Sequence, residues 1–382
     1  MKISQIAIQD ISGIVGKLSH LAEISPQLIL VFGCVEHFSH PDFFRILKSA
    51  FPAAEMVGCT TAGEISSAVV SNSTSIITAI HFESASFQVA TAELKEMDAS
   101  FQAGKVLAHQ LQSSDLKAVM LFGQGVNING SALIEGMVNV LGTSLPVTGG
   151  LAGDDGAFSK TFILSPQGVS TSDVVAIGLK GEKLLFSHGS FGGWRAFGPT
   201  RKVTKCVGNV LYELDGNPAL DVYKRYLGDY AKDLPGSGLL FPFEMLGDSR
   251  ESLGQIRTIL GINEGDGSLI LAGAINPDGY LRLMHAHTND LVDGAEMAAH
   301  ATVDGLPSPS GQSLGLLVSC VGRKLVMGGR VDEEVEAVQD ILGKNTVLCG
   351  FYSNGEICPG YKLEACSLHN QTMTITYLAE LS

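Results

Sequence analysis

One pattern of elements recurs along this chain and limits the folds that it can adopt. Its first copy has an apolar run at residues 28–34, a helical stretch around residues 41–51, and the glycine-rich motif VGCTTAGEI at residues 57–65. Short apolar runs bounded by glycine are typical of buried strands. The order strand, helix, strand and glycine loop therefore predicts a βαβ unit with parallel strands.

Two more copies of this pattern follow along the chain. The last copy carries GFYSNGEI at residues 350–357, which shares the spacing Gly-x-x-x-x-Gly-Glu-Ile with the first. Coincidence is the alternative in a chain with 45 glycines, but the flanking elements repeat as well. We therefore interpret the repeated motif as the result of duplication. The expected strands and helices of these copies lie at residues 118–123, 130–141, 147–153, 314–320, 332–342 and 347–353.

Segments with the character of antiparallel strands separate the copies, at residues 75–82, 174–179, 183–191 and 268–274. The sequence Asn-Pro-Asp-Gly at 276–279 predicts a hairpin turn. Together these patterns predict a mixed α/β fold, with mixed sheets built from repeated βαβ units in two intimately packed domains. A helix is expected to start at Pro218, and we place the domain boundary before it, giving domains at 1–200 and 201–382.

Composition excludes several classes of partner. The 382 residues carry a formal net charge of −14, and the basic residues are scattered, so nucleic acid and anionic membranes are poor partners. No signal peptide or run of about 18 apolar residues is evident, which predicts a cytoplasmic protein. The seven cysteines do not form a disulfide framework typical of small secreted domains.

Four motifs resemble the FIST sensory domains, in which an N-terminal and a C-terminal part occur together. The motifs cover nearly the whole chain and are VGCTTAGEI at 57–65, GGLAGDD at 149–155, YELDGNPAL at 212–220 and GFYSNGEI at 350–357. The resemblance implies a small-ligand sensor that regulates a partner enzyme, either a histidine kinase or a diguanylate cyclase or phosphodiesterase of cyclic-di-GMP. A chain of this size is similar to the NosP branch, which implies haem b and nitric oxide sensing.

A haem sensor requires an axial ligand in an apolar pocket, together with cations or amide groups for the propionates. If residues 184–191 form a strand, His188 shares one face with Phe186 and an apolar wall. Trp194 and Arg195 follow directly, and Arg195 could reach a propionate. The alternative for His188 is a half-buried imidazole bonded to a carbonyl group.

Two other features could supply a haem ligand. His285 and His287 lie two residues apart on an expected strand, so their imidazoles share a face, although exposed histidines beside a turn are the alternative. Cys358 precedes a proline, and this dipeptide resembles that of some redox-regulated haem sites in which a thiolate ligates iron.

The glycine loops offer a second hypothesis that does not involve haem. They follow equivalent strands, so they are expected to gather at the carboxyl ends of the strands, where open α/β sheets bind ligands. The carboxylates of Glu64, Asp154, Asp155 and Glu356 could bind the amine of an amino-acid-like ligand. The alternative is that these carboxylates cap turns.

An enzyme is the least favoured interpretation, and we predict that the chain is not one. Cys59 is the most plausible nucleophile, but the equivalent residues of the other copies are Gly150 and Phe351, which favours a structural role for Cys59. No Walker loop, Rossmann fingerprint or zinc-protease motif is present.

Overall fold

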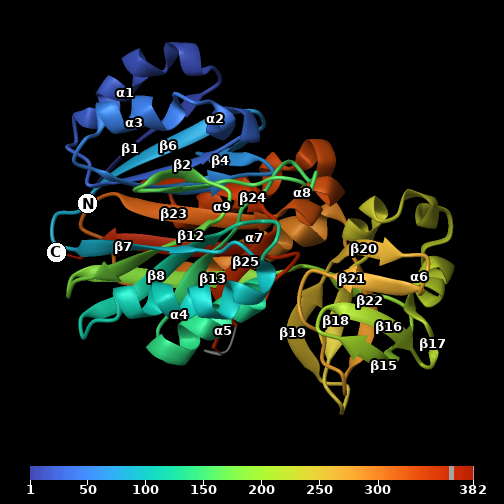
Figure 1. Cartoon of the computed structure of the whole chain (residues 1–382). Helices are drawn as coiled ribbons and strands as arrows, with labels where there is room; N and C mark the ends of the chain where they lie inside the picture. Colours follow the sequence, from blue (N-terminus) through green and yellow to red (C-terminus); the bar gives the residue numbers. More distant parts are fainter. Residues whose placement is uncertain (361–364, 382) are drawn as a thin grey trace.

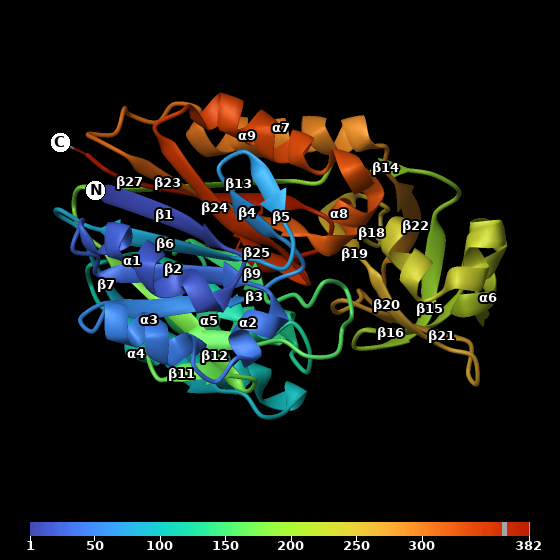
Figure 2. The ribbon, with the colours of Figure 1, turned by 90° about the horizontal axis from the view of Figure 1, so that it is seen from above.

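The computed structural model describes residues 1–360 and 365–381. Three units of similar topology form a core, and a lobe of residues 195–285 is inserted into the third unit after its first strand. The lobe lies to one side of the core in Figures 1 and 2. Among the described residues, no helix has the length and apolar character that crossing a bilayer requires.

Each unit begins with a strand and a helix, continues with a βαβ crossover, and ends with a short hairpin and a last strand. The first unit comprises β1 (Lys2–Ile8), η1 (Ile11–Gly13), α1 (Ile14–Ala22), β2 (Leu28–Gly33), α2 (Val35–Ser39), α3 (Phe43–Ala50), β3 (Glu55–Thr60), β4 (Glu64–Ser66), β5 (Val69–Ser71) and β6 (Ser75–His81). The second comprises β7 (Ser86–Glu93), η2 (Met97–Ala99), α4 (Ser100–Leu111), β8 (Leu116–Gly123), α5 (Gly130–Leu141), β9 (Val147–Leu151), β10 (Ile163–Ser165), β11 (Gly168–Ser170) and β12 (Asp173–Lys180). The third comprises β13 (Leu184–Phe191), α7 (Thr288–Val303), β23 (Ser313–Cys320), α8 (Val321–Met327), η5 (Gly328–Arg330), α9 (Asp332–Leu342), β24 (Thr346–Ser353), β25 (Gly355–Pro359), β26 (Cys366–His369) and β27 (Met373–Glu380).

The lobe is an antiparallel sheet with one long helix against it. Its elements are β14 (Arg195–Ala196), β15 (Arg201–Val207), β16 (Val210–Leu214), β17 (Asn217–Pro218), α6 (Ala219–Leu227), η3 (Gly228–Asp233), η4 (Gly236–Leu240), β18 (Phe243–Leu246), β19 (Ser252–Arg257), β20 (Ile259–Asn263), β21 (Ser268–Leu271) and β22 (Tyr280–His285). The hairpin predicted at 276–279 is wrong: this turn joins β21 to β22, but β21 pairs with β16 and β20, whereas β22 pairs with β14, β15 and β18.

The three units exchange hairpins in a ring. Hairpin β4–β5 joins the sheet of the third unit beside β24, hairpin β10–β11 joins that of the first beside β3, and hairpin β25–β26 joins that of the second beside β9. The three crossover pairs, β2–β3, β8–β9 and β23–β24, are parallel, as the sequence predicts. The predicted fold class, mixed α/β from repeated βαβ units, is therefore confirmed.

Helices cover the outer faces of the three sheets, and one apolar cluster fills the space between the inner faces. Helices α1 and α3 cover the first sheet and α4 and α5 the second, on opposite sides of the core in Figure 1, while α7 and α9 cover the third (Figure 2). At the centre, the ring of Phe32 lies 5.6 Å from that of Phe122 and 4.8 Å from that of Phe351. Residues of all three sheets therefore share one core.

Equivalent backbone atoms of the three units bond to each other in a cycle where the hairpins cross. The amide of Gly153 donates to the carbonyl of Thr60 at 2.8 Å, that of Asn354 to Leu151 at 3.2 Å, and that of Ala62 to Tyr352 at 2.8 Å. The three glycine loops that the sequence predicts to gather at strand ends therefore meet here.

Candidate functional site

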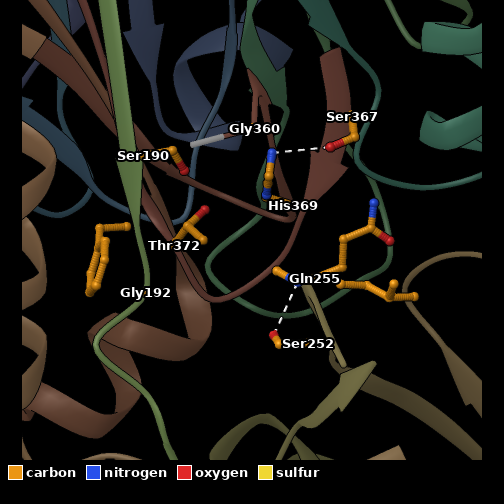
Figure 3. A pocket seen from close by; sticks show the side chains of 11 residues that line it. Ser190, Gly192, Ser252, Gln255, Gly360, Ser367, His369 and Thr372 are labelled. Atoms are coloured by element: carbon orange, nitrogen blue, oxygen red, sulfur yellow. Dashed lines mark hydrogen bonds between the residues drawn. The ribbon is translucent and has the colours of Figure 1, made fainter. Parts of the chain in front are cut away.

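A cavity of about 320 Å³ lies where the lobe meets the core, and we call it the core–lobe cavity. Figure 3 shows its labelled residues converging from β13, from the hairpin β25–β26 and the connection between β26 and β27, and from β19 of the lobe. The lining residues are Ser190, Phe191, Gly192, Ser252, Leu253, Gly254, Gln255, Gly360, Ser367, His369 and Thr372. Most of the side chains in this set can form hydrogen bonds.

His369 is the most buried titratable group of this lining, with only 6% of its surface exposed. Its Nε2 lies 3.0 Å from the carbonyl oxygen of Cys358 and 3.2 Å from the hydroxyl of Ser367. Because a carbonyl only accepts, Nε2 carries the proton, and Nδ1 is an acceptor. Burial lowers the pKa of His369 to about 4, so the ring is neutral near pH 7.

Beneath the cavity, Thr372 donates to a fully buried carboxylate. Both the amide and the hydroxyl of Thr372 bond to Oε2 of Glu356, at 3.0 and 2.9 Å, and Ser353 donates to Oε1 at 2.7 Å. Burial raises the pKa of Glu356 to about 7, although these hydrogen bonds oppose the shift. Glu356 therefore holds Thr372 in place through these hydrogen bonds but does not itself line the cavity.

The same arrangement occurs at the equivalent place in the first unit. Glu64 accepts the hydroxyl of Thr61 and, at 3.1 and 2.7 Å, the amide and hydroxyl of Thr74. Burial raises the pKa of this carboxyl as well. A buried glutamate that ties a hairpin to the following strand thus accounts for the repeated Gly-Glu-Ile, which supports the interpretation as duplication.

One wall of the core–lobe cavity is connected to the helices of the third unit. The carbonyl of Gly192 accepts a hydrogen bond from Arg323, whose guanidinium is 2.6 Å from the carboxylate of Glu334. Both side chains are fully buried. Arg323 also donates to the carbonyl of Leu291 in α7, so Gly192 is held by a network that reaches α7, α8 and α9.

A second cavity, of about 260 Å³, lies at the crossover of the first two units, and we call it the loop cavity. It brings together three of the four predicted carboxylates, those of Glu64, Asp154 and Asp155, and Glu356 is not among its lining residues. Asp154 accepts the amides of Phe158, Ser159 and Lys160 in its own loop.

Of the three predicted carboxylates in the loop cavity, Asp155 has the most exposed side chain, at 81%, and its carboxylate is 3.2 Å from Nζ of Lys324. Glu64 and Asp154 are instead occupied by their own hydrogen bonds. The alternative that these carboxylates cap turns therefore describes Glu64, Asp154 and Glu356.

The predicted haem residues fall into two groups. His188 and Phe186 lie on one face of β13, as predicted, with their ring centroids 6.5 Å apart, and Phe186 packs on the central core. Nδ1 of His188 lies 3.7 Å from the thiol of the buried Cys358. Burial lowers the pKa of His188. Two ligand candidates proposed from separate segments are thus adjacent.

The second group lies where the chain enters and leaves the lobe. Arg195 is paired with His285 across β14 and β22, and its guanidinium bonds to Asp290. The rings of His285 and His287 are 5.3 Å apart, and His287 caps α7. Trp194 is buried in a small cluster and donates to the carbonyl of Gln371 at 2.8 Å.

None of the six predicted haem residues lines the core–lobe cavity or the loop cavity. In the described part of the chain, no group of three or more His, Cys, Asp or Glu residues is arranged to hold a metal ion. A haem group needs its axial ligand to face an apolar space as large as the macrocycle. As placed among the described residues, the six predicted haem residues do not meet that requirement at either of these two cavities.

Cys59 is fully buried in the central core beside Phe32. Burial raises the pKa of its thiol well above the ordinary value. The strand registers confirm that Cys59, Gly150 and Phe351 are equivalent. Gly150 has a steric reason of its own, since a Cβ there would lie 2.6 Å from Cγ1 of Val318.

Sequence reasoning missed most of the core–lobe cavity. Ser190 follows two residues after the predicted His188, but Ser252, Gln255, Ser367, His369 and Thr372 were not proposed. They belong to segments about 60 to 180 residues apart in the chain, and isolated polar residues in strands carry no motif. Only the fold, which places the lobe beside hairpin β25–β26, brings them together.

Known proteins resemble this chain in sequence over much of its length. A FIST N domain model matches residues 27–217, and a FIST C domain model matches residues 219–359. An uncharacterised protein of Methanocaldococcus jannaschii is 27% identical over 214 residues, which are 54% of this chain and 41% of that protein. Uncharacterised proteins of two Mycobacterium tuberculosis strains are 26% identical over 58% of this chain and 59% of their own length. The chain thus spans less than two thirds of these relatives.

Among solved structures, the cyanuric acid hydrolase from A. caulinodans aligns over 100% of this chain and 99% of its own, with a TM-score of 0.40 and 10% identity. A second cyanuric acid hydrolase aligns with a TM-score of 0.35 and 10% identity, over 99% of both chains. At these scores the likeness supports no argument about activity. The two domain models match in order and together extend from residue 27 to residue 359. The chain therefore belongs to the FIST family, whose domains are small-ligand sensors in signalling proteins.

Proposed function

We propose that this chain senses a small polar molecule in the core–lobe cavity and regulates a partner signalling enzyme. The observation that carries this proposal is that the residues lining the cavity come from three different parts of the fold. Ser190 comes from the third sheet and Thr372 from the connection that leads into its strand β27, Ser367 and His369 come from an exchanged hairpin, and Ser252 and Gln255 from the lobe. A ligand bonded to all three parts binds best when they are held in one arrangement.

Such a site can convert binding into a signal. A ligand shifts a conformational equilibrium only as far as its affinity differs between the two states. A cavity shared by the lobe and the core supplies that difference, because movement of the lobe separates the groups that contact the ligand. The network of Gly192, Arg323 and Glu334 connects the cavity wall to α9. The proposed partner that responds to this conformational change is a histidine kinase or an enzyme of cyclic-di-GMP metabolism.

The lining favours a polar ligand over haem. Among the described residues that line the cavity, Phe191 and Leu253 are the large apolar ones, and the others are polar or glycine. A volume of about 320 Å³ suits a ligand of metabolite size. Haem b with nitric oxide remains a prediction from the family resemblance, with His188 as its proposed ligand.

The test is thermal melting of the full chain against a panel of amino acids, small carboxylic acids and sugars. A ligand at about 100 times its Kd stabilises a protein by roughly 2.7 kcal/mol, which raises Tm. The variant Ser190→Trp fills the cavity with an indole, so we expect it to remain folded and lose the shift. Glu182→Trp, in the exposed turn before β13, is the matched control and keeps the shift. An equal shift in both variants would contradict the site.

Haem is tested in parallel by the absorption spectrum after reconstitution, under reduction and with nitric oxide. Our account predicts no stoichiometric Soret band. A band that shifts with nitric oxide and disappears in His188→Ala would support the gas-sensor function in place of the one proposed.

A further inference from the structure

Arg257 is a buried cation at the end of β19, behind the core–lobe cavity. Only 4% of its surface is exposed. Its Nε donates to the carbonyl of Ala274 at 3.1 Å, and one terminal nitrogen donates to the carbonyls of Ile256 and Leu368 at 3.1 and 3.3 Å. The other terminal nitrogen donates to Oε1 of Gln255 at 3.1 Å.

The positive charge of Arg257 has no negative partner in the described part of the chain. Carbonyl and amide oxygens satisfy four of the five N–H groups of this guanidinium, and no carboxylate of residues 1–360 or 365–381 forms an ion pair with it. Burial lowers the pKa of Arg257 to about 10, so the group remains charged near pH 7. Burying a charge without a counter-charge is costly, and proteins rarely keep one without a function.

The guanidinium lies beside a concave surface that continues from the core–lobe cavity. A groove of about 530 Å³ between α5 and the lobe is lined by Arg257, and Leu253, Gln255 and Ser367 line both this groove and the cavity. Gly273 packs directly against the guanidinium: a Cβ there would be 2.9 Å from Nε. The Arg257 side chain is therefore fixed by the fold beside the proposed ligand site.

We propose that the ligand of the core–lobe cavity carries a carboxylate that reaches the adjoining groove, where Arg257 and Gln255 bind it. This inference rests on the proposed function, because it assigns the chemical class of the molecule bound there. Among residues 1–360 and 365–381, one terminal N–H of Arg257 and Nε2 of Gln255 have no hydrogen-bond acceptor. Two neighbouring donors match the two oxygens of a carboxylate.

The charges of the described residues around the groove favour a ligand with a single negative charge at this end. Glu135 of α5 is exposed and lines the same groove, and the chain as a whole carries a formal net charge of −14. A phosphate, with three terminal oxygens and up to two charges, would leave acceptors unsatisfied at a site with two donors. His369 is neutral at pH 7 and adds no positive charge.

The test compares acids with amides of the same shape. Thermal melting of the full chain is measured with acetate, butyrate and benzoate, and with acetamide, butyramide and benzamide, in buffers of matched ionic strength. At least one acid is expected to raise Tm more than its amide. Titration calorimetry of that acid should show binding weakened about tenfold to a hundredfold in Arg257→Gln, because a hydrogen bond to a charged group is lost.

Two further variants keep the inference falsifiable if Arg257→Gln folds poorly. Gln255→Leu leaves the cation in place and removes the second donor, so it should weaken the acid and not the amide. Arg225→Gln, on the exposed side of α6, is the control and should bind the acid normally. Equal binding of acid and amide, or no carboxylate-specific shift with any of the three acids, would overturn the inference.

The results also separate this inference from the proposed function. If Ser190→Trp abolishes binding of an acid and its amide alike, and Arg257→Gln changes neither, the cavity is a ligand site but not an anion site. Glu364 lies outside the described residues, so Glu364→Gln is measured beside the others. Binding of the acids only after this replacement would show that Glu364 is the counter-charge of Arg257, and would contradict the proposal.

Discussion

Glu356 illustrates how a residue beneath the ligand site can make stability depend on pH. Its pKa, raised by burial to about 7, exceeds the ordinary value of 4.5. The folded protein therefore binds this proton more tightly than the unfolded chain does. The stability that Glu356 contributes is fully present below pH 4.5 and is lost as the pH rises through about 7.

We predict that Glu356→Gln removes this dependence. A difference of about 2.5 pKa units corresponds to roughly 3 kcal/mol between pH 4.5 and pH 8. Urea unfolding of both proteins across this range measures it, since other titrating groups cancel in the difference between them. A difference between wild type and variant that does not change with pH would show that Glu356 is ionised in the folded protein at all these pH values.

Thiol reactivity tests the structural role of Cys59. It is fully buried, whereas Cys206 in β15 is partly exposed. We expect iodoacetamide to alkylate Cys206 first in the native protein and Cys59 only after unfolding, as read by peptide mass spectrometry. Rapid native alkylation of Cys59 would return the Cys59-dependent enzyme to consideration.

At the scale of single elements, local pattern predicted much of the core. Helices at 130–141 and 332–342 were expected and have these bounds in the structure. Their apolar spacing and the glycines after them are local signals. The partners of the short hairpins could not be predicted in the same way. The sequence pattern of β4 would be the same whether the strand paired within its own unit or, as it does, with β24.

The glycine that begins each of the three repeated loops has a steric reason that a substitution can test. Gly350 in β24 has a φ of +155°, and a Cβ there would lie 1.9 Å from the carbonyl oxygen of Leu317. We predict that Gly350→Ala costs about 2–4 kcal/mol of stability, from overpacking and backbone strain, as measured by urea unfolding. Gly329→Ala is the control, since no atom lies within 4 Å of the added Cβ. Equal midpoints for the two variants would contradict the close approach of β23 and β24.

At the scale of the whole molecule, the exchange of hairpins predicts that the three units fold together. A fragment of residues 1–200 contains β4 without its partner β24, and β9 without its partner β25. We expect fragments 1–200 and 201–382 to be unstable when produced separately and to gain structure when mixed. Circular dichroism and urea unfolding of each fragment check this. A cooperative transition of fragment 1–200 alone would show that the predicted domain boundary also divides the fold.

The candidate site belongs to this largest scale, which explains why sequence reasoning reached only part of it. Glu64, Asp154 and Asp155 were expected together and line one cavity, because their loops follow equivalent strands. The core–lobe cavity depends instead on the position of an inserted lobe, which no repeat or motif indicates. The burial of Arg257 could not be predicted either, because no local sequence pattern distinguishes this arginine from the exposed ones.

Hydrogen exchange of the full chain tests the central claim most directly, with and without the panel compound that most raises Tm. A ligand in the core–lobe cavity should slow exchange together at residues 190–192, 252–255 and 367–372, which belong to the three parts that form the lining. Protection confined to the loop cavity, at residues 34–36, 61–64 and 154–160, would contradict the claim and favour the amino-acid-like ligand at the acidic loops.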